Sequence, residues 1–160
     1  MEYLDLYYIE NDKLTGETMV RGGEVPEGRY FNVVICYMEN SNGEFLIQRA
    51  SIQKGHKCSS TGGHVQAGQT LKEAMVREIK EEIGIDVSED ELEFKGRWLK
   101  NNVVMCNAYY MKRDIDINEC KLQEEEVESV FWKTKEEIEE MIKNDEFFET
   151  GAKLFEDFIR

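Results

Sequence analysis

Short runs rich in β-branched and aromatic residues predict the strands of this chain. The runs at residues 3–10 (YLDLYYIE), 31–39 (FNVVICYME) and 44–50 (EFLIQRA) have this composition. Asn42-Gly43 separates the second run from the third, and this dipeptide favours the positive φ angles of a type I′ turn. The second and third runs are therefore predicted to pair as a β-hairpin.

The first thirty residues predict a small β extension ahead of this hairpin. Asn11-Asp12 is typical of a turn, residues 18–20 can return as a second strand, and residues 22–28 contain three glycines and the only proline. We expect residues 1–30 to cover an edge of the main sheet or to form a homodimer contact, and not to act in catalysis.

Residues 71–83 show the clearest helical periodicity. At about 100° per residue, their apolar side chains form one broad arc. The arc comprises Leu71, Ala74, Met75, Val76, Ile79 and Ile83. Thr70 with Glu73 has the spacing of a capping box, and Gly84 follows as the C-cap. A helix that begins after Thr70 and ends before Gly84 is therefore predicted.

Three acidic residues of this helix lie where apolar residues are expected. Glu78 and Glu82 point into the middle of the apolar arc, and Glu81 lies at its edge. A carboxylate that faces inward costs several kcal/mol, or becomes protonated, unless a positive partner meets it. Three carboxylates that converge on one volume exceed what a single lysine can neutralise, and they favour a divalent metal. Because no histidine or cysteine shares this face, oxygen ligation predicts Mg²⁺ or Mn²⁺ rather than zinc.

The remainder of the chain predicts three more strands and two helices. The predicted strands span residues 92–99, 103–112 and 127–132, and the predicted helices span residues 134–143 and 146–159. Strands before and after a central helix, followed by C-terminal helices, indicate an α/β fold with a mixed sheet between layers of helices.

The length and composition fit one globular domain over residues 1–160. Hydrophobic residues make up 41% of the chain, and no apolar run reaches the roughly 18 residues of a membrane span. The net charge of −14 disfavours binding to nucleic acid. The four cysteines have no C-x-x-C spacing, and we interpret them as reduced thiols of a cytoplasmic protein without a signal peptide.

The segment from Gly63 to Ile85 resembles the Nudix box. Gly63, five residues, Gln69, seven residues and the run REIKEEIGI follow the family pattern of a glycine, a glutamate and then R-E-U-x-E-E-x-G-U, in which U is aliphatic. Gln69 alone departs from this pattern, because the family usually has glutamate there. Since an amide keeps the size and the hydrogen bonding of glutamate, we expect Gln69 to tune metal affinity without abolishing activity.

This resemblance implies a Nudix-type α/β/α sandwich with a mixed central sheet and a metal-dependent hydrolase. The implied reaction cleaves a diphosphate linkage in a nucleoside diphosphate derivative or a related small molecule. Mg²⁺ is the expected ion, with Mn²⁺ as an alternative. The implied metal ligands are the carboxylates of Glu78, Glu81 and Glu82, the carbonyl of Gly62 and, from an acidic loop, the carboxylate of Glu126.

Other residues receive roles in catalysis and substrate binding from the same resemblance. One of the box glutamates, or the downstream carboxylate, accepts the proton of the attacking water, and Arg77 orients a carboxylate. Gly63 lets the backbone approach the bound groups closely. Arg49 has two interpretations, as a surface strand residue or as a bidentate ligand of a substrate phosphate. Lys54 lies in the polar loop before the box and is more typical of a solvated residue.

Two other functions compete with hydrolysis. The Gly-Gly-His run before the box is similar to that of isopentenyl-diphosphate isomerase. This chain, however, has Gly62 where the isomerase has its catalytic cysteine, and Cys58 is displaced by four residues. A sensor that binds a nucleotide without cleaving it would be expected to lack a helix glutamate, and none is lost. The sequence therefore favours the hydrolase.

Overall fold

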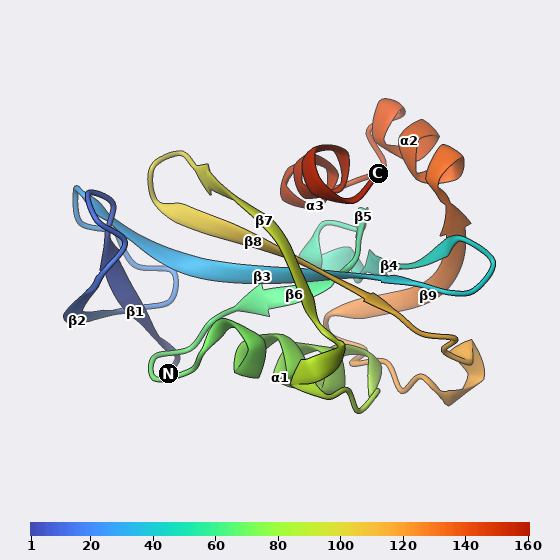
Figure 1. Cartoon of the computed structure of the whole chain (residues 1–160), viewed down its shortest axis with the longest axis horizontal. Helices are drawn as coiled ribbons and strands as arrows, with labels where there is room; N and C mark the ends of the chain where they lie inside the picture. Colours follow the sequence, from blue (N-terminus) through green and yellow to red (C-terminus); the bar gives the residue numbers. More distant parts are fainter.

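The computed structural model describes residues 1–160 as a mixed sheet of nine strands with helices on both faces. In Figure 1, α1 (Leu71–Ile83) lies below the sheet, whereas α2 (Lys135–Lys143) and α3 (Glu149–Leu154) lie above it. The predicted α/β/α sandwich with a mixed central sheet is confirmed.

Strand β3 (Arg29–Glu39) is the longest strand and the axis of the sheet. One edge of β3 pairs in parallel with β8 (Val104–Lys112) along nearly its whole length. The outer edge of β8 pairs antiparallel with β7 (Glu93–Lys100). This side of the sheet is therefore continuous, and it corresponds to the two strands predicted around the turn at residues 100–102.

The other edge of β3 is shared by several strands in succession. β1 (Tyr3–Tyr8) pairs at its beginning, β6 (Thr61–His64) in its middle, and β4 (Glu44–Ala50) only where Glu39 meets Phe45. β3 and β4 therefore diverge beyond their hairpin turn. The outer edge of β4 pairs with β9 (Val127–Thr134).

Two strands lie within the segment predicted as a loop before the box. β5 (Cys58–Ser59) pairs with β4, and β6 pairs with β3, so the chain between them crosses the divergence of the two long strands. This correction places Gly62 and Gly63 on a strand held by β3. The glycine-rich sequence indicates a loop, but the open edge of β3 supplies hydrogen bonds that make it a strand.

Alternation along β3 builds a core on each face of the sheet. Val34, Cys36 and Met38 face the α1 side and pack with Ile79 and Ile83 of that helix. The residues of β3 that alternate with these three point to the opposite face of the sheet, toward the apolar side chains of α2 and α3. The sheet is therefore buried on both faces over its central strands, which explains the nearly continuous apolar run in β3.

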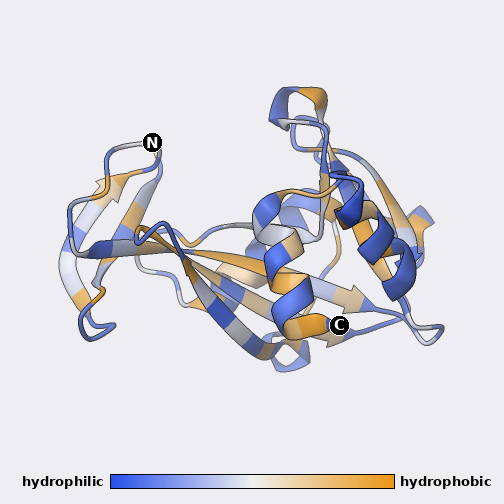
Figure 2. Ribbon diagram, turned by 90° about the horizontal axis from the view of Figure 1, so that it is seen from above, coloured by the Kyte–Doolittle hydropathy of each residue, from blue (hydrophilic) through white to orange (hydrophobic).

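The N-terminal extension is a hairpin at one end of the molecule, as Figure 2 shows in the view from above. β1 pairs antiparallel with β2 (Leu14–Val20), and β1 continues onto β3 through Tyr7 and Tyr30. The expectation that this extension covers an edge of the main sheet agrees with its position. The return strand begins at Leu14 rather than at residue 18.

The helices follow their capping signals, with one correction at the C-terminus. Thr70 and Thr134 both form the predicted capping boxes, at the starts of α1 and α2. The predicted last helix over residues 146–159 is wrong at its start, because residues 146–148 are extended and hydrogen-bond to Cys58 of β5. The helix begins at Glu149, and residues 155–159 continue it with wider π-type turns.

Candidate functional site

Helix α1 presents Glu78 and Glu82 on its buried side. The capping box at Thr70 fixes the start of the helix, and its apolar stripe packs on β3, so the side-chain positions follow from the helical period. Glu78 and Glu82 are each only 9% exposed. The side chain of Glu81 is 48% exposed, in agreement with its predicted place at the edge of the arc.

Glycines 62 and 63 on β6 allow the helix to approach the sheet. A Cβ atom on Gly63 would overlap the carboxyl group of Glu78, and one on Gly62 would overlap the backbone of β3. Neither glycine is needed for a positive φ angle; each is needed for close approach. The backbone of β6 is therefore in direct contact with the acidic side of α1.

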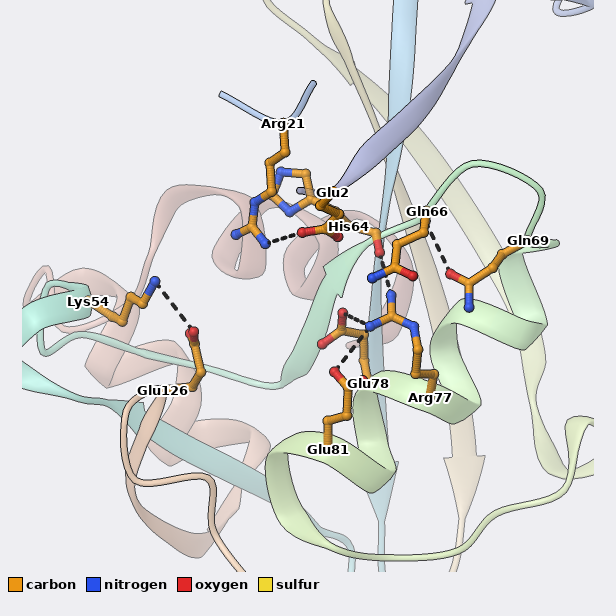
Figure 3. Close-up of polar contacts among 10 residues, drawn as sticks. All are labelled: Glu2, Arg21, Lys54, His64, Gln66, Gln69, Arg77, Glu78, Glu81 and Glu126. Atoms are coloured by element: carbon orange, nitrogen blue, oxygen red, sulfur yellow. Dashed lines mark hydrogen bonds and ion pairs between the residues drawn. The ribbon is translucent and has the colours of Figure 1, made fainter. Parts of the chain in front are cut away.

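Arg77 lies between the carboxylates of Glu78 and Glu81, as Figure 3 shows. Its Nη1 is 3.1 Å from an oxygen of Glu78 and 3.1 Å from an oxygen of Glu81. Its Nη2 donates a 2.9 Å hydrogen bond to the carbonyl of His64 on β6. Nε is buried without a partner. Arg77 thus orients two box carboxylates and ties the helix to β6.

Glu82 is bound by groups from the sheet. One of its oxygens accepts hydrogen bonds from Nε2 of Gln48 (3.2 Å) and from the backbone N–H of Gly62 (3.3 Å). The amide oxygen of Gln48 accepts in turn from the hydroxyl of Thr61 (2.8 Å). Gln48 was not among the predicted site residues. The sequence does carry a signal for Gln48, because its polar side chain lies on the same face of β4 as buried Leu46. Glu82 was identified by the same kind of signal, a polar residue where an apolar one is expected.

Burial makes the ionised forms of these two carboxylates costly. Burial raises the pKa of Glu78 to about 7, and it raises the pKa of Glu82 to about 8, with the neighbouring charge of Glu78 adding to the effect. Arg77 offsets only part of the cost at Glu78. The acidic side of α1 is therefore short of positive charge at neutral pH.

Glu126 approaches the same region from the loop before β9. Its carboxylate lies 3.4 Å from Nζ of Lys54, and its backbone carbonyl accepts a 3.0 Å hydrogen bond from the N–H of Ser51. Glu126, Lys54 and Glu82 all line one cavity. The loop carrying Lys54 is therefore part of the site wall.

The cavity has a volume of about 570 Å³ and lies where β3 and β4 diverge. Its wall on β3 is apolar, with Phe31, Val33 and Ile35, and its acidic end holds Glu82 and Glu126. Phe31 stacks on the ring of His64, with ring centroids 5.5 Å apart. Additional lining comes from the turn between β7 and β8 and from the start of α3, through Lys100, Asn101, Phe148 and Thr150. Such a cavity suits a small molecule with an apolar or aromatic part and an anionic part.

Comparison with known proteins decides the family. A model of the NUDIX domain matches residues 29–158. The chain belongs to the Nudix family. An uncharacterized Nudix hydrolase of Listeria monocytogenes is 31% identical over 153 residues, which cover 92% of this chain and 88% of that protein. Nudix hydrolases are pyrophosphohydrolases that act on nucleoside diphosphate derivatives and in general need divalent metal ions.

Solved structures show the same fold. A Deinococcus radiodurans protein has a TM-score of 0.80 at 25% identity, with 99% of this chain and 100% of that chain covered. A bifunctional NMN adenylyltransferase/ADP ribose pyrophosphatase of Francisella tularensis, complexed with AMP and a Mn ion, has a TM-score of 0.65 at 14% identity. That likeness covers 85% of this chain and 42% of that chain, and it shows the fold alone.

An isopentenyl-diphosphate isomerase of Salmonella heidelberg matches a shorter stretch. It is 33% identical over 58 residues, which cover 34% of this chain and 32% of the isomerase. The isomerase-like relatives expected from the sequence are therefore present, but the Listeria Nudix hydrolase matches almost the whole of the chain.

Four of the predicted site residues do not line the cavity: Arg77, Glu78 and Glu81 of α1, and Arg49 of β4. Because side chains alternate along β4, Gln48 points to Glu82 and Arg49 points to the opposite face. Nη1 of Arg49 donates a 3.1 Å hydrogen bond to the carbonyl of His56. The structure therefore favours the first of the two interpretations of Arg49, that of a surface residue of the strand. Gln69 lies in the loop before α1, where its side-chain oxygen accepts a 3.1 Å hydrogen bond from the N–H of Gln66.

The donors on α1 suit a hard divalent cation, although they are not gathered around one point. Arg77 stands between Glu78 and Glu81, and no three His, Cys, Asp or Glu side chains are grouped closely enough to hold a metal. The donors are oxygens, two of them are buried and short of positive charge, and Gly63 leaves the approach to Glu78 free of a side chain. These residues fit such an ion if the carboxylates of Glu78 and Glu81 contact both Arg77 and the ion.

None of the helices is long and apolar enough to cross a membrane.

Proposed function

We propose that this Nudix chain catalyses metal-dependent hydrolysis of a diphosphate linkage in a nucleoside diphosphate derivative or a related small molecule. One observation carries the proposal. Glu78 and Glu82 are buried on the apolar side of α1, and Glu82 also lines the cavity between β3 and β4. A fold gains nothing in stability from two buried carboxylates with elevated pKa values.

We assign the metal to the carboxylates of Glu78, Glu81 and Glu82 and the carbonyl of Gly62, with Glu126 as a further ligand. Mg²⁺ is the ion that we propose, and Mn²⁺ suits the same oxygens. When bound, the ion neutralises diphosphate charge, polarises a P–O bond and lowers the pKa of the attacking water. The proximity of Gly62 to Glu82, through a 3.3 Å hydrogen bond, supports a shared role for these two groups.

The remaining residues bind, orient and accept protons. Arg77 holds Glu78 and Glu81 in place and anchors them to β6 through the carbonyl of His64. Glu126 and the box glutamates are the carboxylates available to accept the proton of the attacking water. We keep Gly63 as a substrate-binding position, because its lack of a side chain lets the backbone of β6 lie directly against the carboxyl group of Glu78.

We place the uncharged part of the substrate against the apolar wall of the cavity. Phe31 and the ring of His64 are stacked there, and burial lowers the pKa of His64 to about 4, so that this ring is neutral at pH 7. A neutral aromatic pair suits a base or another flat group. The net charge of −14 argues against a nucleic acid partner. We further propose that residues 1–160 act as one domain in the cytoplasm, because Cys36, Cys58, Cys106 and Cys120 are all free thiols.

The isomerase alternative has weaker support. Gly62 occupies the position of the isomerase cysteine. Cys58 is fully buried on the face of the sheet opposite α1, in the core that packs against α2 and α3. Burial raises the pKa of the Cys58 thiol, which disfavours its reactive thiolate.

A substrate screen tests the proposal. The purified chain is incubated with Mg²⁺ or Mn²⁺ and with nucleoside diphosphates, nucleoside triphosphates, sugar nucleotides, dinucleoside polyphosphates and isoprenyl diphosphates. We expect hydrolysis products that disappear in Glu82→Gln and persist in Glu140→Gln, whose glutamate is exposed on α2. An isomer without phosphate release would identify an isomerase, and binding without turnover would identify a sensor.

A further inference from the structure

The N-terminal hairpin brings two charged side chains to the site. The match to the NUDIX domain begins at residue 29, after both β1 and β2. Figure 3 nevertheless shows Glu2 and Arg21, at the open end of the hairpin, beside His64 and above Arg77 and Glu78. The extension therefore lies beside the candidate site and not only at the edge of the sheet.

The hairpin is fixed to the loop that precedes α1. The N–H of Ala67 donates a 2.8 Å hydrogen bond to the carbonyl of Tyr3, and the N–H of Gly68 donates a 2.8 Å hydrogen bond to the carboxylate of Asp5. The N–H of Arg21 donates a 2.9 Å hydrogen bond to the carbonyl of Glu2. These backbone contacts fix the position of Arg21 relative to the box.

The guanidinium of Arg21 is close to the site and still accessible. Its Nη1 is 2.9 Å from the carboxylate of Glu2, and its side chain remains 48% exposed. Burial is the main cause of the low pKa of His64, and the positive charge of Arg21 lowers that pKa further. The same charge also opposes the effect of burial on the pKa of Glu78. Arg21 is therefore an electrostatic neighbour of both residues.

The other cations of the site differ from Arg21 in their partners: Arg77 and Lys54 contact the predicted metal ligands, and Lys100 pairs with Glu149 of α3. Arg77 is occupied by two carboxylates and by the carbonyl of His64, with its side chain 21% exposed. Lys54 pairs with Glu126. Arg21 has a single side-chain partner, Glu2. Burial is the largest single effect on the pKa of Glu2 and raises it, but the hydrogen bond and the charge of Arg21, with smaller contributions from Gln66 and His64, together lower that pKa. A guanidinium held on one side and open on the other is suited to bind an anion.

We propose that Arg21 binds a phosphate oxygen of the diphosphate substrate, with Glu2 as the positioning residue that holds its guanidinium toward the site. This inference rests on the proposed function. A guanidinium forms charge-assisted hydrogen bonds with phosphate, and its planar fork matches two phosphate oxygens. In a chain of net charge −14, a fixed cation beside His64 also offsets the repulsion of an anionic ligand.

Calorimetric titration with methylenediphosphonate in the presence of Mg²⁺ tests the inference. This probe resists hydrolysis and carries no base, so its binding reports the phosphate contacts alone. We expect Arg21→Ala to weaken binding roughly ten- to a hundredfold, as for other hydrogen bonds to charged groups. Arg21→Lys should weaken it less, because a point charge remains. Glu2→Gln should fall between wild type and Arg21→Ala.

Arg29→Ala is the matched control. Arg29 also joins the hairpin to the sheet by an ion pair, with Nε 3.0 Å from Glu17, but its guanidinium lies over the ring of Tyr8, at the opposite end of β1 from Glu2. Its replacement should leave the affinity unchanged. An equal loss of affinity in Arg29→Ala, unchanged affinity in Arg21→Ala, or no binding of the probe to the wild type would each overturn the inference.

Turnover separates this inference from the proposed function. If the wild type hydrolyses a substrate of the screen and Arg21→Ala keeps its KM and its probe affinity, only the role of Arg21 fails. If the wild type hydrolyses none of the substrates but needs Arg21 to bind the probe, the proposed function fails and the anion contact stands. For a true phosphate contact, Arg21→Ala raises KM for the best substrate while its melting temperature stays near that of wild type.

Discussion

Replacing Glu78 with glutamine should reveal the cost of a buried carboxylate as a change in the pH dependence of stability. Burial raises the pKa of Glu78 from 4.5 to about 7 in the folded protein. The folded state therefore binds a proton that the unfolded state releases between these values. The stabilisation from this proton is complete below pH 4.5 and is lost as the pH rises through about 7.

The size of the effect follows from proton linkage. Between pH 5.5 and 8, the ionisation of Glu78 should cost the metal-free wild type about 2 kcal/mol of unfolding free energy. Glutamine resembles the protonated form and does not titrate. As the pH rises over this range, the unfolding free energy of Glu78→Gln should therefore increase by about 2 kcal/mol relative to that of the wild type. This corresponds to roughly 4–8 °C in melting temperature. Loss of the Glu78 charge also removes one cause of the elevated pKa of Glu82, which acts in the same direction.

The assay is thermal unfolding with EDTA at both pH values, followed by turnover with Mg²⁺ on the best screened substrate. Glu81→Gln is the matched control, because Glu81 contacts the same arginine but has a side chain that is 48% exposed. It should keep most of the pH dependence of the wild type. Glu78→Gln should flatten that dependence and lose most of its turnover. A variant that melts lower at both pH values and remains active would refute the reasoning and leave Glu78 as a structural partner of Arg77.

Three further outcomes test other parts of the site. Glu82→Gln should weaken Mn²⁺ binding by about tenfold or more in calorimetry, and unchanged affinity would move the metal elsewhere. Gly63→Ala should lower turnover by about tenfold or more with an unchanged circular dichroism spectrum, because its Cβ would displace the carboxyl group of Glu78. Normal turnover there would show that the close approach is not needed. Cys58→Ser should keep most turnover, and a loss of roughly a hundredfold with an intact fold would instead indicate thiol catalysis.

The predictable part of the fold is the part specified by local signals. The capping box and the apolar stripe placed α1 correctly, and Asn42-Gly43 marked the turn between β3 and β4. The strands β5 and β6 were missed because their pairing depends on the divergence of β3 from β4, which no local pattern records. Pairing between distant segments also explains the error at residues 146–148, where contacts with Cys58 replace the predicted helical turn.

The predictable part of the site is the part on one helix. Glu78 and Glu82 were identified because two acidic residues occupy the apolar arc of α1, and the structure confirms that both are buried. Gln48 carries a comparable signal on a strand, but a single polar residue in a short alternating run is weaker than a helical stripe. Arg49 was placed by resemblance alone, and the alternation of β4 points it away.

Arg21 shows the limit of reasoning from a motif. It is separated from the box in sequence, lies before the match to the NUDIX domain and follows an ordinary hairpin strand. Only the pairing of β1 with β3 and the contacts of residues 3 and 5 with the loop at residues 67–68 bring it beside His64. One helix can supply the acidic groups of a hydrolase, and its sequence pattern reveals them. Contacts to the substrate come from segments that are distant in sequence and that only the fold brings together. If Arg21 binds phosphate, this hairpin is where the chain adds a substrate contact of its own to the Nudix site.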